Sequence, residues 1–259
     1  MTLFECKDVQ YAYQNRFPAL GGISLAIEAG SRIALVGANG SGKSTLLGVL
    51  DGLVFPQSGT VRFAGKALTE SALQNETFSV DFRRRVGLVF QNPDVQLFCP
   101  TVREDIAFGP LQLGVEPSTV EKRMEAVAKD LGIEPLLDRP PHQLSVGEKR
   151  KVAFATVLVI EPEVLLLDEP TAGLDPRTTT HLIELLHQAT HRGQTIITAT
   201  HDLHIVADIA DTIHVFGLDR RLVASGTTEE ILGNHDLLQT NNLVHLHPQH
   251  TRDHRKYHW

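Results

Sequence analysis

The sequence predicts an α/β fold with a mostly parallel sheet, an antiparallel β subdomain and a helical subdomain. Short, continuously apolar runs in the second half of the chain alternate with segments of helical periodicity, as in proteins whose strands are buried on both faces. Residues 4–13 and 23–28 instead alternate polar and apolar side chains, which is typical of antiparallel strands with one solvated face. With 259 residues, of which 42% are hydrophobic, the chain can build one large core or two modest ones.

The individual elements follow from the same periodicities. The continuously apolar residues 33–36 predict a buried strand, which leads into a glycine-rich turn and a helix over 44–53. Residues 120–131 have apolar side chains at helical spacing and predict an amphipathic helix. The other predicted elements are strands at 60–63, 86–90, 164–167, 195–200 and 212–216, and helices at 146–160, 178–190, 203–210 and 228–232.

Composition excludes several classes of protein. The formal net charge of −7 argues against a nucleic-acid-binding protein, which usually has a basic stripe. Cys6 and Cys99 lie far apart and predict neither a disulfide framework nor a CxxC metal site, so we expect a reducing compartment. No apolar run reaches the ~20 residues that cross a bilayer, and residues 1–6 lack the features of a signal peptide. We therefore expect a soluble, cytoplasmic protein.

A glycine-rich loop follows the first buried strand. Residues 37–45, with the sequence GANGSGKST, fit the nucleotide-loop pattern G-x-x-x-x-G-K-[ST]. Glycines allow the backbone N–H groups to turn inward around phosphate oxygens, and the helix that follows adds its positive N-terminal end. In this pattern Lys43 pairs with the β- and γ-phosphates and the Ser44 hydroxyl binds Mg²⁺. The sequence therefore predicts a nucleotide site on a P-loop NTPase core, with Mg²⁺ beside the phosphates.

Two carboxylates end the apolar run at 164–167. Asp168 suits a contact with Mg²⁺, directly or through water, because carboxylate oxygens are ligands that this ion prefers. Glu169 is the next residue and can orient or deprotonate the attacking water. The alternative is a strand that simply ends in solvated acidic residues.

These motifs, together with LSVGEKR at 144–150, Gln91, AGLD at 172–175 and His201, resemble the nucleotide-binding domain of ABC transporters. The likeness covers roughly residues 3–230. It implies an ABC nucleotide-binding domain over 1–230, with a helical subdomain at about 92–150, and a short His-rich C-terminal tail over 231–259. We expect the tail to be poorly ordered.

The resemblance assigns roles to single residues. Tyr13 stands where an aromatic residue stacks on adenine, Gln91 where a glutamine reaches Mg²⁺ and the attacking water, and His201 where a histidine contacts the γ-phosphate. The predicted nucleotide-binding residues are Tyr13, Gly37, Asn39, Gly40, Ser41, Gly42, Lys43, Ser44 and Thr45; the catalytic residues are Gln91, Glu169 and His201; and the Mg²⁺ contacts are Ser44, Gln91 and Asp168.

The segment at 144–150 implies a dimer. In the family, its residues, here Leu144, Ser145, Gly147 and Glu148, serve the ATP bound by the opposite subunit, and Asp175 crosses the dimer interface. Val146 replaces the usual first glycine, and a β-branched residue disfavours positive φ and close backbone approach. Because one chain has one phosphate loop and one such segment, the resemblance implies a head-to-tail homodimer with two ATP molecules between the subunits.

The start of the helical subdomain resembles the ATPases of energy-coupling-factor importers, which take up vitamins and transition-metal ions. The resemblance rests on residues 91–98 and 101–110, and it implies a groove for a coupling helix of a transmembrane subunit, with Val95, Leu97 and Phe98 as candidate contacts. It also implies a substrate-binding membrane subunit and a place on the cytoplasmic face of the cell membrane, as a peripheral protein.

The transported substrate is predicted from weaker signals. Residues 67–82 and 241–248 resemble the cobalt/nickel branch, and imidazole suits Co²⁺ and Ni²⁺. The sequence therefore favours a cobalt or nickel importer; the alternatives are a vitamin importer, for example for biotin, and a soluble, non-transport ABC ATPase. The histidines of the tail are a candidate weak metal site or part of a solvated terminus: His245, His247, His250, His254 and His258.

Overall fold

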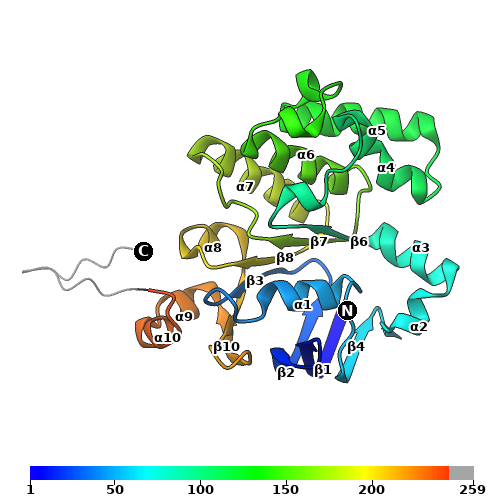
Figure 1. Cartoon of the computed structure of the whole chain (residues 1–259). Helices are drawn as coiled ribbons and strands as arrows, with labels where there is room; N and C mark the ends of the chain where they lie inside the picture. Colours follow the sequence, from blue (N-terminus) through cyan, green and yellow to red (C-terminus); the bar gives the residue numbers. More distant parts are fainter. Residues whose placement is uncertain (245–259) are drawn as a thin grey trace, which may run out of the picture.

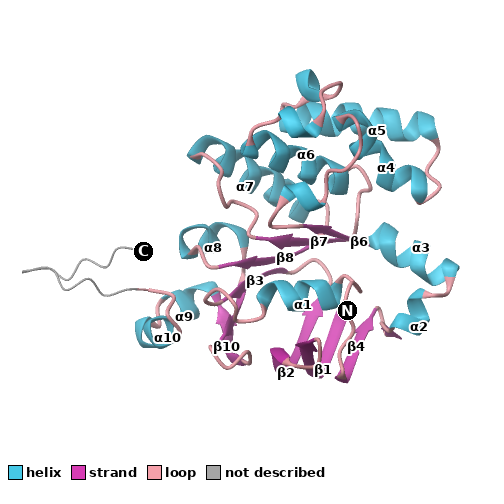
Figure 2. Cartoon of the chain, viewed as in Figure 1, coloured by secondary structure: helices cyan, strands magenta, loops and turns pink. Residues whose placement is uncertain are grey.

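Two sheets organise the chain (Figures 1 and 2). The computed structural model describes residues 1–244. An antiparallel sheet has the strand order β2-β1-β4-β5, and a six-stranded sheet has the order β10-β9-β3-β8-β7-β6. The second sheet is parallel except for its edge strand β10, which pairs antiparallel with β9. This arrangement confirms the predicted fold class.

The strands of the antiparallel sheet are β1 (Thr2–Tyr13), β2 (Phe17–Glu28), β4 (Ser58–Phe63) and β5 (Lys66–Ala67); those of the mostly parallel sheet are β3 (Arg32–Val36), β6 (Val86–Val89), β7 (Val164–Asp168), β8 (Thr195–Thr200), β9 (Thr212–Phe216) and β10 (Leu222–Thr227). The α-helices are α1 (Lys43–Leu50), α2 (Glu70–Leu73), α3 (Glu76–Arg85), α4 (Val102–Gln112), α5 (Pro117–Leu131), α6 (Val146–Leu158), α7 (Pro176–His191), α8 (Leu203–Ile209), α9 (Thr228–Leu232) and α10 (His235–Thr240).

The parallel sheet separates two hydrophobic cores. Along β3, Ile33 and Leu35 pack into the core shared with α1 and the antiparallel sheet, whereas Ala34 and Val36 pack into the core shared with α4–α8. Alternation of this kind follows from the two-residue repeat of a strand. Because both faces are covered, both sets of side chains are apolar, which explains the continuously apolar runs in the sequence. Figure 1 shows α4–α7 on one side of this sheet and α1 with the antiparallel sheet on the other.

The strand order brings the predicted site residues to one edge. The loop at 37–45 follows β3, His201 follows β8, Asp168 ends β7, and Gln91 lies two residues beyond β6. These four strands are consecutive neighbours in the order β3-β8-β7-β6. Since they are parallel, their carboxyl ends meet at the same edge, which is where open α/β sheets bind ligands.

The structure differs from the sequence prediction beyond α9, which lies at the predicted residues 228–232. The expected poorly ordered tail instead begins with α10, and Leu238 is fully buried in the core that contains α4–α8. Leu243 and Val244 pack partly against the same core. The sequence obscured this because the apolar residues are few and are separated by polar ones. The five histidines from His245 to His258 lie outside the described residues.

Helix α4 was also not predicted as a separate element. Its interior contains Gly109 and Pro110, which both disfavour helix from sequence alone. Thr101 compensates at the other end, because it forms a capping box with Glu104. Within residues 1–244, no helix is long and apolar enough to span a membrane, and no group of three or more His, Cys, Asp or Glu side chains could hold a metal ion.

Candidate nucleotide-binding and catalytic site

The loop between β3 and α1 is built for close backbone approach. Gly42 caps α1 with φ at 107°, and a Cβ at this position would lie 2.3 Å from the carbonyl oxygen of Ala19. Only glycine fits both requirements. Lys43 is 5% exposed, and its ammonium donates to the carbonyl oxygens of Gly37, at 2.7 Å, and Ala38, at 3.1 Å. The loop thus curls around the lysine, with the glycines at the positions that the nucleotide-loop pattern requires.

Burial sets the electrostatics of this lysine. It lowers the pKa of the Lys43 ammonium, while the carboxylates of Glu169 and Asp168 act in the opposite direction. The hydroxyl of Ser41, a residue of this loop, is buried and has no hydrogen-bond partner among the described residues. A cation and an unpaired hydroxyl at a glycine-rich helix start suit a phosphate group.

Ser44 and Asp168 meet as a pair of oxygen donors. The Ser44 hydroxyl donates to Oδ1 of Asp168 at 2.9 Å, although the two residues are 124 positions apart. Burial raises the pKa of the Asp168 carboxyl, and the hydrogen bond from Ser44 opposes this shift. A hydroxyl and a carboxylate at this distance form a hard-oxygen donor set of the kind that Mg²⁺ takes, so the residues present fit this ion.

The side chain of Glu169 is buried, and both of its carboxylate oxygens accept hydrogen bonds. Its side chain is 5% exposed, and its Oε2 accepts a hydrogen bond from the Thr200 hydroxyl at 3.0 Å. Oε1 accepts from the backbone N–H of His201 at 3.1 Å and lies 2.7 Å from Nδ1 of the same residue. The structure therefore brings the predicted carboxylate and the predicted histidine together, and it adds Thr200. No sequence signal distinguishes Thr200, because it looks like the last residue of a buried strand.

The backbone of Glu169 is unusual as well. Its φ is 46°, in the left-handed region that non-glycine residues rarely adopt. Its N–H donates to the carbonyl oxygen of Ala199 on β8 at 2.8 Å, and its carbonyl accepts from Arg150 at 2.7 Å. Arg150 also donates to the carbonyl of Gln91 at 2.6 Å. In the sequence, Arg150 stands only as the last residue of the 144–150 motif, which assigns it no role.

Tyr13 lies beside the end of the loop. Its hydroxyl is 3.3 Å from Oγ1 of Thr45, and its ring packs edge-to-face against Tyr11 at a centroid distance of 5.0 Å. The Tyr13 side chain remains 46% exposed. An aromatic ring held at one edge with an exposed surface next to the loop suits stacking on a base.

The segment at 144–150 starts helix α6. Ser145 is its N-cap, and Glu148 completes a capping box, because its Oε2 accepts from the Ser145 N–H at 2.8 Å and from the Ser145 hydroxyl at 2.7 Å. The hydrogen bond from the Ser145 hydroxyl lowers the pKa of Glu148. Val146 is the first residue of the helix and is not among the residues with positive φ. The backbone cost expected for a β-branched residue here is therefore absent, and its side chain is 60% exposed.

The predicted interface residue Asp175 forms its hydrogen bonds within its own helix start. Asp175 is exposed and caps α7, accepting from the N–H of Thr178 at 3.0 Å and its hydroxyl at 2.7 Å; these bonds lower the pKa of Asp175.

In the segment after Gln91, Val95 and Phe98 are 63% and 65% exposed. Leu97 is 8% exposed and belongs to the core, so the expectation that it contacts a partner is wrong.

Comparisons with known proteins place the chain in a family. The sequence profile of the ABC transporter family matches residues 20–172. The nickel import ATP-binding protein NikO of Rhodobacter capsulatus is 49% identical over 245 residues, covering 93% of this chain and 95% of that protein. The energy-coupling factor transporter ATP-binding protein EcfA of Methanoculleus marisnigri is 44% identical over 245 residues, covering 94% and 86%.

Solved structures give the same result. The structure of CbiO1 from Clostridium perfringens, described as part of the ABC transporter complex CbiONQ, superposes with a TM-score of 0.77 and 37% identity, over 93% of this chain and 95% of that one. The dimeric ATP-binding cassette MJ0796 bound to ADP and phosphate superposes with a TM-score of 0.79 at 25% identity, over 87% and 99%.

The fold and the loop define a P-loop ATPase. The chain belongs to the ABC transporter family: it binds ATP and is an ATPase coupled to transport.

Proposed function

We propose that this chain is the ATP-hydrolysing subunit of an energy-coupling-factor importer that takes up cobalt or nickel ions. The observation that supports this most strongly is the 49% identity to a nickel import ATP-binding protein over 93% of the chain. The 44% identity to an energy-coupling factor ATP-binding protein supports the importer class. The likeness to CbiO1, a part of a CbiONQ complex, points in the same direction.

The chemistry proposed for the site is in-line attack of water on the γ-phosphate. Lys43 and the amides of the loop would hold the β- and γ-phosphates, and Tyr13 would stack on the adenine. Ser44, Asp168 and Gln91 would hold Mg²⁺, which when bound neutralises the charge on the phosphates. Glu169 would orient and deprotonate the attacking water, and the imidazole of His201, whose Nδ1 lies 2.7 Å from Glu169, would contact the γ-phosphate.

The active form is proposed to be a homodimer. Among residues 1–244, the hydrogen bonds of Ser145 join it to Glu148 and Lys149 of the same helix start, and none joins it to the loop at 37–45 of its own chain. Ser145 and Gly147, at the exposed start of α6, would therefore serve the ATP of the second subunit, and Asp175 would lie at the interface.

The surface for the membrane partner is proposed around Val95 and Phe98. Both are more than half exposed, and the Phe98 ring packs edge-to-face on the 43% exposed Phe108 at 5.0 Å. Exposed aromatic and aliphatic side chains in one place are typical of an interaction surface. A coupling helix of a transmembrane subunit would cover them and hold this chain at the cytoplasmic face of the membrane, beside a substrate-binding membrane subunit.

Two substitutions test the ATPase site. Glu169→Gln is expected to bind ATP and dimerise while losing most turnover, because the amide cannot accept the proton of water. Lys43→Ala is expected to weaken ATP binding itself, as measured by nucleotide titration. Hydrolysis near the native rate in Glu169→Gln, or unchanged ATP affinity in Lys43→Ala, would reject the assigned roles.

Uptake separates the possible cargoes. Cells with and without this chain are compared for accumulation of labelled Co²⁺, Ni²⁺ and biotin, with Glu169→Gln as the matched inactive control. Loss of Co²⁺ or Ni²⁺ uptake in both the deletion and the variant supports the proposal. Loss of biotin uptake alone would replace it with a vitamin importer, and recovery of the chain from detergent extracts without any membrane protein would contradict the importer altogether.

A further inference from the structure

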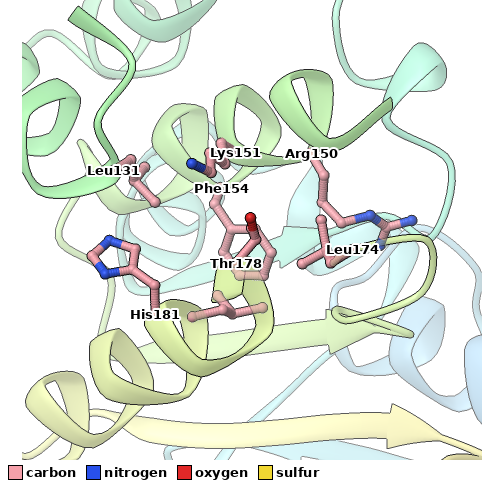
Figure 3. A pocket seen from close by; sticks show the side chains of 8 residues that line it. Leu131, Arg150, Lys151, Phe154, Leu174, Thr178 and His181 are labelled. Carbon is pink, nitrogen blue, oxygen red and sulfur yellow. The ribbon is translucent and has the colours of Figure 1, made fainter. Parts of the chain in front are cut away.

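Arg150 is the side chain that connects the two halves of the proposed catalytic edge. It lies on α6, is 4% exposed, and its guanidinium donates through Nη1 to the carbonyl of Glu169 at 2.7 Å and through Nη2 to the carbonyl of Gln91 at 2.6 Å. In Figure 3 the side chain extends from α6 toward the loop that carries Leu174, and its guanidinium group lies away from the hollow lined by Phe154 and His181. Arginine is suited to this arrangement because its planar fork presents several donors at fixed angles.

An ion pair and hydrogen bonds join helix α6 and the segment after β6 into one unit. Lys149 of α6 forms an ion pair with Asp94 at 2.7 Å. The Gln96 side chain donates to the carbonyl of Ala153 at 2.8 Å and to the hydroxyl of Thr156 at 2.7 Å, and it accepts from the N–H of Phe90 at 3.2 Å. These contacts link residues 90–96 to α6.

Glu169 is joined to this unit through its backbone. Its N–H is fixed to β8 and its carboxylate to Thr200 and His201, all on the side of the parallel sheet. Its carbonyl instead accepts from Arg150, on the helical side. The left-handed φ of 46° is disfavoured for a glutamate, and the hydrogen bonds of its N–H to Ala199 and of its carbonyl to Arg150 offset part of that cost.

We propose that Arg150 is a positioning residue, which links the backbone of Glu169 to that of Gln91 and so couples the orientation of the catalytic carboxylate to the position of α6. The inference rests on the proposed role of Glu169 in the attack of water. It assigns Arg150 no contact with ATP. Its loss should therefore lower kcat and leave the KM for ATP nearly unchanged, because it alters the placement of the carboxylate and not the binding of the nucleotide.

Three full-length variants test this assignment by steady-state ATP hydrolysis. Arg150→Met removes all donors at similar length, and kcat is expected to fall at least about tenfold with the KM for ATP within about twofold. Arg150→Lys keeps the charge, but its shorter side chain has one nitrogen in place of the two that reach the carbonyls of Glu169 and Gln91, so kcat is expected to fall several-fold with little loss of thermal stability. Lys151→Met, one position further along α6, is the matched control, because within residues 1–244 its ammonium forms no hydrogen bond or ion pair and its charge is the smallest of the influences on the pKa of Glu148; it should retain native kcat. A native kcat in Arg150→Lys would overturn the proposal, even if Arg150→Met fails to fold.

A double-mutant cycle distinguishes positioning from a general structural role. If Arg150 acts through Glu169, Arg150→Lys lowers single-turnover hydrolysis in the native background but has no further effect in a Glu169→Gln background. If the two effects multiply, Arg150 acts elsewhere and the inference is wrong. Native turnover in Glu169→Gln alone would instead refute the proposed role of Glu169, so the two failures give different results.

Discussion

Thr200→Val tests whether the surroundings of Glu169 are tuned for catalysis. Thr200 is fully buried, and its hydroxyl donates to Oε2 of Glu169 at 3.0 Å and accepts from the N–H of Asp202 at 3.0 Å. Valine has the same shape, so the substitution removes both hydrogen bonds without creating a cavity. A hydrogen bond to a charged group contributes about 1.5–3 kcal/mol and a neutral one about 1 kcal/mol, so the free energy of unfolding should fall by roughly 2–4 kcal/mol.

The same change should slow hydrolysis. A carboxylate that has lost one donor samples other rotamers, and we expect kcat to fall about tenfold, which corresponds to ~1.4 kcal/mol. Thr200→Ser is the matched control, because it keeps the hydroxyl and removes one methyl group, at a cost of about 1 kcal/mol. Urea denaturation and steady-state ATP hydrolysis measure the two effects. A native kcat in Thr200→Val, or an equal loss in Thr200→Ser, would refute the reasoning.

Three further changes test other parts of the structure. Gly42→Ala should weaken ATP binding more than tenfold in a nucleotide titration, since its Cβ would meet a backbone oxygen at 2.3 Å, whereas Gly40→Ala, with open space around its Cβ, should lose less. Burial raises the pKa of Asp51 from 3.8 to about 7. Between these two values the folded state retains a proton that the unfolded state releases. The contribution of this group to stability therefore falls as pH rises from about 4 to 7. The stability of Asp51→Asn relative to the native protein should therefore increase over that window, by at most about 1.4 kcal/mol per pH unit in urea denaturation at each pH, and a constant difference would contradict this. Leu238→Ala should cost about 2–5 kcal/mol if α10 belongs to the core, whereas the exposed Gln239→Ala should cost little; equal stabilities would show that α10 contributes nothing.

Local patterns account for what could be predicted of the site. The loop at 37–45 is defined by the positions of its glycines, Lys43 and Ser44, because a phosphate nest is made by consecutive residues and needs no distant partner. The continuously apolar strands were visible for a similar reason, since a strand buried on both faces has to be apolar throughout. The end of the chain was misread because Leu238 is buried by contacts with residues far away in sequence, which no local pattern displays.

The fold class, the phosphate loop and the order of the strands and motifs along the chain can all be derived from the amino-acid sequence. Which of these segments come into contact depends on how the strands pair. The order β3-β8-β7-β6 brings Ser44 to Asp168 and Glu169 to His201, and both Thr200 and Arg150, to which the sequence assigned no role, contact Glu169. Hydrogen bonds and burial depend on distance in space, and strand pairing sets that distance even for Ser44 and Asp168, which are 124 positions apart.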